Sequence, residues 1–266
     1  ARNLPKLAHA EAVQLATDEL ERFLALLESL SSEDWQQPTV CTLWNVSQMV
    51  AHLAGTAAGY TSWAQFKRQF ITNPYASRTA LKVDAISMCQ VEDRAGATPA
   101  ALLDELRELG PRAIRTRQRL PWLLRNLCVP LGPPLGIAPI GYLTDLIYTR
   151  DMWMHRLDIC RATGRGMSLT ADHDGRIVEL VMRDLGKKLH RRLGKRNIRV
   201  ELTGPAGGIF DFGSGSGPSA TLQMDTLDFN WLAAGRTSPE DIRSEVLARG
   251  DTDQAEWFLA NTNVPF

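Results

Sequence analysis

Residues 45–57 read NVSQMVAHLAGTA and begin the clearest helix of the chain. Asn45 is a favourable N-cap, and Gln48 three residues later completes a pattern similar to a capping box. The apolar stripe that follows has the 3.6-residue period of a helix with one buried face, and it consists of Val46, Met49, Val50, Leu53 and Ala57. We expect this helix to run to about Phe70 and to stop before Pro74.

Three more long helices are expected around this one. The first spans His9 to Leu30, where leucine and alanine recur at helical spacing. Another spans Pro99 to about Leu120, with Thr98 as its N-cap, and the last spans about Ile140 to Ala162. Four long helices joined by loops predict an up-down four-helix bundle, which we assign to residues 1–168.

The connection over residues 121–139, PWLLRNLCVPLGPPLGIAP, is too rich in proline and glycine for a regular helix. A connection this long and this apolar predicts either a packed lid or the lining of a pocket. Trp63, Trp122 and Trp153 are candidates for the pocket wall, with ordinary core packing as the alternative.

Short apolar runs replace long helices in the last hundred residues. A helix over about 171–193 leads to strands at 198–203, 209–212 and 220–224, with the turn GSGSGP at 213–218 between two of them. Helices at 226–234 and 252–261 flank a further strand near 244–248. This pattern predicts an α+β chain whose second, small domain covers residues 169–266.

Composition removes several classes of function. The chain has 30 Lys+Arg and 30 Asp+Glu, so no basic excess favours nucleic acid as a partner. Its apolar stretches are interrupted before the roughly 20 residues of a membrane span, and no signal-peptide pattern begins the sequence. We expect a cytoplasmic protein that binds neither nucleic acid nor membrane, as a monomer or homodimer, with four reduced cysteines.

The chemistry-bearing pattern is RDMWMHRLDIC at residues 150–160. Asp151 and His155 are four residues apart, so both project from one face of the helix, and carboxylate and imidazole are typical zinc ligands. His52 lies mid-helix in QMVAHLAG, where a facing helix of the bundle could meet it. Three ligands of this kind leave positions open for water or substrate, as in a catalytic site.

This spacing has ordinary explanations too. An Asp and a His four residues apart are often only surface or capping residues, and a single histidine in an apolar helix is usually a hydrogen-bonded core residue. Zinc fits the ligand types best, with iron, nickel and manganese as alternatives.

Three segments together resemble the mycothiol-dependent maleylpyruvate isomerases, a branch of the DinB-like metal-binding bundles. The first is Trp44, Asn45, Val46 and then His52-Leu53-Ala54-Gly55; the second is Asp151, His155, Arg156 and Asp158; the third is Gly235-Arg236 followed by Gly250-Asp251. The similarity spans nearly the whole chain. It implies His52, Asp151 and His155 as metal ligands and Arg236 as a catalytic residue that clamps an anion, with a surface arginine as the alternative for Arg236.

The resemblance also implies a reaction. The metal would bind the thiolate of mycothiol or a similar small thiol, which adds to an electrophilic carbon of a small substrate; expulsion gives isomerisation and retention gives an S-conjugate. One departure stands out, because the family generally has Glu where this chain has Asp151. We expect the shorter side chain of Asp151 still to bind the metal, since Asp and Glu are both oxygen ligands. The exact reaction follows less directly from the resemblance.

Two other readings stay open. One is a thiol-independent metalloenzyme of specialised metabolism with an apolar substrate pocket, or a hydrolase that activates water. The other is a ligand-binding or stress-response protein without turnover. Around the ligands, Asp158 either orients a ligand imidazole or, as we expect, pairs with a nearby arginine, and Arg156 is expected to be solvated or interdomain.

Overall fold

A computed structural model describes residues 1–132, 135–215 and 217–266 of the chain. Its contacts divide it into two compact units, one of residues 8–167 and one that combines residues 1–7 with 168–266. The first seven residues, which the sequence analysis places with the bundle, therefore have their contacts in the second unit. Pro133 and Pro134 of the apolar connection and Ser216 of the GSGSGP turn lie outside the described residues.

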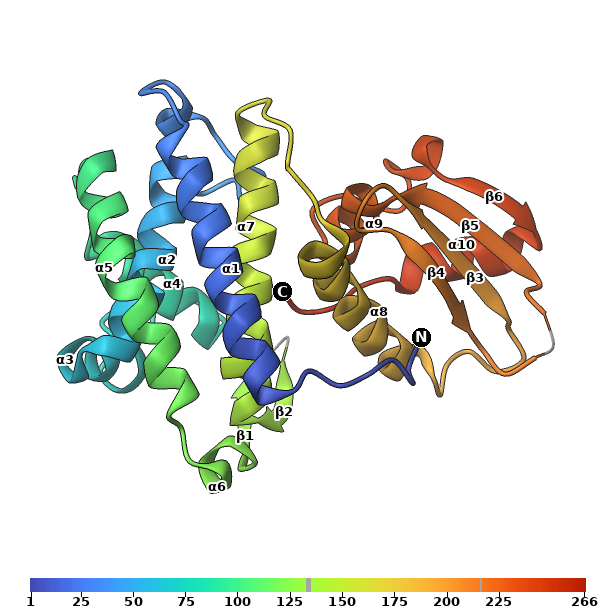
Figure 1. Cartoon of the computed structure of the whole chain (residues 1–266), viewed down its shortest axis with the longest axis horizontal. Helices are drawn as coiled ribbons and strands as arrows, with labels where there is room; N and C mark the ends of the chain where they lie inside the picture. The colour runs from blue at the N-terminus through green and yellow to red at the C-terminus, as the bar shows by residue number, and fades with distance from the viewer. Residues whose placement is uncertain (133–134, 216) are drawn as a thin grey trace. The chain divides into compact units, whose positions relative to one another are not determined.

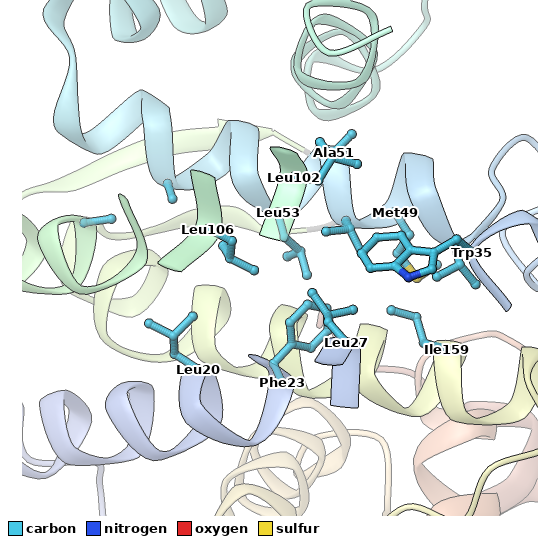
Figure 2. Close-up of a cluster of buried hydrophobic side chains, with 14 of the residues drawn as sticks. Leu20, Phe23, Leu27, Trp35, Met49, Ala51, Leu53, Leu102, Leu106 and Ile159 are labelled. Atoms are coloured by element: carbon cyan, nitrogen blue, oxygen red, sulfur yellow. The ribbon is translucent and has the colours of Figure 1, made fainter. Parts of the chain in front are cut away.

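Four long helices form the body of the larger unit (Figure 1), and the prediction of an α+β fold with a helical N-terminal region is confirmed. They are α1 (His9–Glu28), α2 (Val46–Thr61), α5 (Pro99–Gln118) and α7 (Tyr148–Ala162). Figure 2 shows their shared core, in which Leu20 and Phe23 of α1 point toward Leu53 of α2 and Leu106 of α5. Burial of such side chains contributes roughly 1.5–3 kcal/mol each.

The expected helix starts occur where the capping residues predict them. The Asn45 carboxamide accepts a hydrogen bond from the Gln48 N–H at 2.9 Å, and the Asn45 N–H donates to Gln48 Oε1 at 3.0 Å. Thr98 Oγ1 accepts from the Ala101 N–H at the start of α5. Each cap satisfies an N–H that a helix end leaves without an intrahelical partner.

The structure adds elements that the sequence analysis did not predict. The helix of His52 ends at Thr61, not near Phe70, and the chain continues through α3 (Trp63–Phe66) and the π-helical turn η2 (Lys67–Ile71). A fifth helix of some length, α4 (Lys82–Glu92), packs against α2. A second π-helical turn, η3 (Tyr142–Ile147), leads into α7, and η1 (Asp34–Gln36) is a short 3-10 turn.

The apolar connection over residues 121–139 is only partly as predicted. It contains a short helix, α6 (Trp122–Arg125), and a hairpin of β1 (Cys128–Gly132) and β2 (Gly136–Pro139). Trp122 is 69% exposed and Ile137 79%, so these described side chains form no packed lid. Trp63 is 71% exposed and lies outside the core as well, whereas Trp153 is fully buried.

The smaller unit contains a four-stranded sheet in the order β4-β3-β5-β6. Its strands are β3 (Ile198–Thr203), β4 (Gly208–Phe212), β5 (Ala220–Asp225) and β6 (Leu247–Gly250), and only the β3–β5 pair is parallel. Alternate residues of β3 and β5 are buried, as expected for a sheet covered on one face.

Helices cover this sheet. Both α9 (Thr226–Ala233) and α10 (Thr252–Asn261) contact β3 and β5, and Phe258 of α10 meets Phe212 edge to face at 4.9 Å. The unit also includes η4 (Ala171–Gly175), α8 (Arg176–Leu189) and η5 (Arg243–Glu245). Within the described part of the chain, no helix combines the length and the apolar character needed to cross a membrane.

Candidate metal centre

The bundle brings together the three residues that the sequence analysis selects. His52 lies on α2, and Asp151 and His155 lie one turn apart on α7. The two oxygens of the Asp151 carboxylate each face one imidazole: Oδ2 lies 3.4 Å from His52 Nε2, and Oδ1 lies 3.4 Å from His155 Nε2. One donor atom from each residue lies within 4.8 Å of the others.

These separations can be compared with those expected for a direct hydrogen bond and for two ligands of one ion. An N–H donor and a carboxylate oxygen that bond directly are usually 2.7–3.2 Å apart. Two ligands that share one zinc at about 2.0–2.1 Å in tetrahedral geometry lie roughly 3.3 Å apart. The observed 3.4 Å therefore matches a pair of ligands on a common ion better than it matches direct hydrogen bonds.

The second nitrogen of each imidazole has a partner that fixes the ring. His52 Nδ1 lies 2.7 Å from Gln90 Oε1, and His155 Nδ1 lies 2.9 Å from Asp158 Oδ2. Both partners are acceptors, so in the neutral ring each Nδ1 carries the hydrogen, and each Nε2, which faces Asp151, is the nitrogen that could bind a metal ion. Outer partners of this kind commonly orient metal-ligating histidines.

The partner of His52 belongs to a chain of amides. Gln90 on α4 donates through Nε2 to Gln69 Oε1 at 2.9 Å, and Gln69 in η2 donates to the carbonyl of Gly55 on α2 at 2.9 Å. Gln69 and Gln90 are 0% and 2% exposed. This buried relay starts at His52 and returns to the same helix one turn later. It therefore fixes, for each amide, which neighbour the oxygen faces and which neighbour the nitrogen faces.

Glycine makes this approach of α4 and η2 possible. A Cβ on Gly55 would lie 2.5 Å from Gln90 Cβ, and one on Gly59 would lie 2.9 Å from Gln69 Oε1. The glycine of the His-Leu-Ala-Gly motif therefore has a steric role: it opens the surface of α2 to the side chain that holds His52.

The carboxylates dominate the electrostatics of the site. Burial opposes the charged form of Asp151, but His155 and His52 outweigh it and hold the pKa of Asp151 well below its usual range. Burial likewise disfavours the imidazolium of His155, but Asp151 and Asp158 raise the pKa of His155 to about 9. The charged forms of this cluster stabilise one another.

Two neighbours of the ligands are buried. Asp158 is fully buried and its Oδ2 lies 2.9 Å from His155 Nδ1, which fits the orienting role, one of the two considered for it. Arg156 is not solvated, because it is 4% exposed and its guanidinium lies 2.9 Å from Glu19 of α1. A buried carboxylate on another helix was not visible from sequence spacing, because α1 and α7 are far apart in the chain.

Arg236, the predicted catalytic residue, lies in the other unit. It follows Gly235, whose φ of +69° ends α9 in the left-handed conformation that favours glycine, and the Arg236 N–H donates to the Trp231 carbonyl at 2.9 Å. Its role as an anion clamp stays a prediction.

Three aspects of the site were missed at the level of sequence. Gln90 and Gln69 were not considered, because neutral amides carry no recognisable spacing and α4 itself was not predicted. Trp44 stacks on His52, with ring centroids 5.2 Å apart. The half-buried thiol of Cys41 forms a second group of possible metal donors with His155 and Asp158, whose donor atoms all lie within 4.8 Å of one another.

Comparison with solved structures shows which known proteins share the fold of this chain. Crystal structures of the mycothiol-dependent maleylpyruvate isomerase and of a histidine-to-alanine variant of it superpose with TM-scores of 0.57 and 0.58. Their sequences are 15% and 14% identical to this chain, and each comparison covers 91% of this chain and 93% of the solved one. At this identity the likeness shows the fold alone. A search of curated proteins finds no match.

The sequence model for the mycothiol maleylpyruvate isomerase N-terminal domain matches residues 16–160. This range contains α2, all but the last two residues of α7, and all three residues of the candidate metal centre. Because the match covers more than half of the 266 residues, the chain belongs to the mycothiol maleylpyruvate isomerase family.

Proposed function

We propose that this chain is a metal-dependent enzyme that uses a small thiol, with mycothiol as the expected cosubstrate, to isomerise a small electrophilic molecule. Its ligands are His52, Asp151 and His155, and zinc is the expected ion. The observation that carries the proposal is the pair of 3.4 Å separations between the imidazole Nε2 atoms and the two oxygens of Asp151.

The donor set fits such an ion. Two neutral imidazole nitrogens and one carboxylate oxygen leave further coordination positions for a cosubstrate. A zinc ion held there lowers the pKa of a bound thiol, which supplies a thiolate at neutral pH. Gln90 and Asp158 keep hydrogen on the Nδ1 atoms, so the Nε2 lone pairs stay available.

The reaction balances without an oxidant. The thiolate would form a C–S bond as the π bond of the attacked double bond opens and its electron pair moves onto the neighbouring conjugated group. Rotation about the bond that is now single, followed by breakage of the C–S bond, would re-form the double bond, return the thiolate and leave an isomer. Retention of the bond instead gives an S-conjugate, so a transferase is the neighbouring outcome. We assign Arg236 to bind an anionic group of the substrate, because a guanidinium matches a carboxylate in a bidentate pair.

Metal analysis of His52→Ala tests the ligand assignment. We expect one equivalent of zinc in the wild-type chain and loss of that metal in the variant, with His190→Ala as the control because His190 is exposed and lies in the other unit. Stoichiometric metal in His52→Ala would show that the ligand set is wrong.

Cobalt substitution tests the thiol. Addition of mycothiol to the cobalt-loaded protein should change its visible absorption, because thiolate coordination alters the ligand field. If millimolar mycothiol causes no change in a sample that holds cobalt stoichiometrically, the thiol-independent metalloenzyme becomes the better assignment.

Arg236→Met should keep the metal and lower kcat/KM by at least about tenfold.

A further inference from the structure

A small cavity inside the helical bundle is lined by an arginine and several hydroxyl groups, with no carboxylate among its described lining residues. Its volume is about 30 Å³, which accommodates about two water-sized groups when one needs roughly 10–15 Å³. Leucine, isoleucine, alanine and methionine side chains of the four long helices form most of its wall, and the polar lining consists of Thr56, Tyr60, Arg117, Tyr148 and Thr149.

Arg117 is the charged residue of this lining. Its guanidinium lies over the ring of Tyr148 at 5.2 Å and over that of Tyr60 at 5.9 Å, and its Nε is buried without a hydrogen-bond partner. The nearby carboxylate of Asp145 is bonded to Arg125 at 2.7 Å and to His9. Among the described residues, no carboxylate pairs with Arg117 or lines the cavity.

Two hydroxyl groups add unused donors. Thr149 is 3% exposed, and its Oγ1 is buried with no hydrogen-bond partner in the described structure. Tyr60 donates to the Tyr148 oxygen at 3.0 Å. Two phenols that share a single hydrogen bond use one O–H, so the other O–H is left for a third group. Thr56 is already committed, because it donates to the His52 carbonyl.

Buried donors without partners are costly. The guanidinium of Arg117, a half-buried residue, has no carboxylate partner among the described residues, and burial lowers its pKa. A ligand that only accepts hydrogen bonds and carries negative charge would satisfy all three groups, whereas a cation or a donor would not.

We infer that this cavity is a subsite for the carboxylate of a small organic acid, held by Arg117, Thr149 and Tyr148. The two oxygens of a carboxylate match the room for about two water-sized groups, and the apolar part of the lining suits the hydrocarbon chain that carries them. A carboxylate is preferred over a larger oxyanion because the cavity is small and most of its lining is apolar.

The cavity adjoins the candidate metal centre along two helices. Thr56 follows His52 by four residues on α2, and Tyr148 precedes Asp151 by three on α7, so in each pair both residues lie on one helix face. If the proposed function is correct, the subsite holds a carboxylate of the substrate itself; this last step rests on the proposed function, whereas the binding of a carboxylate does not.

Propionate and the uncharged, isosteric propionamide test the subsite. The full chain is stripped of metal and titrated with each by calorimetry at constant ionic strength. Saturable binding of propionate, at least about tenfold tighter than that of propionamide, is expected. Equal affinities, or no saturable binding of propionate, would overturn the inference and leave water as the occupant. Binding that appears only after metal is restored would overturn it too, since the metal would then hold the ligand.

Variants locate the binding. Arg117→Met should abolish propionate binding, while Arg115→Met, an exposed arginine of the same helix, should not change it. Thr149→Val and Tyr148→Phe remove only a hydroxyl each, and each should weaken binding about tenfold. If Arg117→Met fails to fold, Thr149→Val and Tyr148→Phe still test the subsite. Propionate affinity equal to that of the wild type in both variants would overturn the inference.

Discussion

At the scale of single residues, the site depends on how its two histidines are held. His155 has the carboxylate Asp158 as its partner, whereas His52 has the neutral amide Gln90. A carboxylate raises the basicity of an imidazole more than an amide does. The two nitrogen ligands are therefore chemically unequal, although both present Nε2 to Asp151.

The amide relay makes Gln90 a positioning residue. Gln90→Met keeps the length of the side chain but removes the acceptor for His52 Nδ1–H, so metal affinity should fall about 10- to 100-fold with helicity unchanged. Gln90→Glu keeps an acceptor and should recover most of the loss. Competition with a chelator measures both, with the exposed Gln14→Met as control. Equal metal affinity in Gln90→Met and wild type would show that the relay serves packing alone.

The charge cluster predicts how the metal-free protein responds to pH. The pKa of His155 is about 9 in the folded state and about 6.5 when unfolded, so its contribution to stability is present below pH 6.5. As pH rises through 9 this contribution is lost, up to roughly 3 kcal/mol. Urea unfolding in EDTA should show this decline between pH 6.5 and 9.

His155→Gln should remove that decline, because no proton is then released from the site. His190→Gln, which changes an exposed histidine, should keep it. A wild-type chain whose free energy of unfolding stays constant over this range would contradict the assigned coupling.

Sequence reasoning predicts some of these residues and misses others for a definite reason. Asp151 and His155 are four apart on one helix, so local geometry alone places them together. His52 could be joined to them only through resemblance, because helix pairing in a bundle is not encoded in spacing. Gln90 could not be found, since it reaches the site from a helix that lacks a strong apolar stripe.

At the scale of elements, the surface of α2 at Gly55 and Gly59 connects helix packing with the metal centre, because it lets Gln90 and Gln69 approach closely. Gly55→Ala adds a methyl group 2.5 Å from Gln90 Cβ, so α4 must shift. We expect a loss of about 1–3 kcal/mol in unfolding free energy, although alanine is the better helix former, together with weaker metal binding. Urea denaturation and a chelator titration measure the two effects. A gain in stability without a change in metal affinity would argue against a tight contact.

Element boundaries were predictable where a side chain caps a backbone N–H. Asn45 and Thr98 begin their helices as expected because the cap is a local interaction. The N-cap of α4 is Leu81, which makes no side-chain capping bond, so its start has no such signal. The π-helical turns are likewise invisible, since a single extra residue in a turn does not alter the apolar period enough to be recognised.

At the scale of the whole molecule, the contacts divide the chain without following its order. Residues 1–7 contact the smaller unit: the Arg183 guanidinium donates to the Leu4 carbonyl at 2.9 Å, and Arg176 donates to that of Pro5. Gly186 on α8 leaves room for this segment, because a Cβ there would lie 2.5 Å from the Arg2 nitrogen. Such long-range pairing has no local signature in the sequence. The sequence therefore predicted a single domain boundary, after residue 168, and did not assign residues 1–7 to the second domain.

All proposed ligands and their amide partners lie in residues 8–167. Expressed alone, this segment should therefore keep its helicity and bind one zinc ion with an affinity within about threefold of the full chain. It should not catalyse the reaction if Arg236 is required. Circular dichroism and a chelator titration check the first expectation, and an unfolded segment, or a folded one without metal, would contradict it.

The discontinuous smaller unit bears on how the protein is made. During translation, residues 8–167 emerge as one uninterrupted stretch and can fold while the remainder is still being synthesised. The segment that contacts Arg176 and Arg183 leaves the ribosome before them, yet it must wait for more than 160 further residues before its partner helix exists. While residues 8–167 are being synthesised, the segment at residues 1–7 therefore has no partner helix, and the smaller unit is completed only after the larger one.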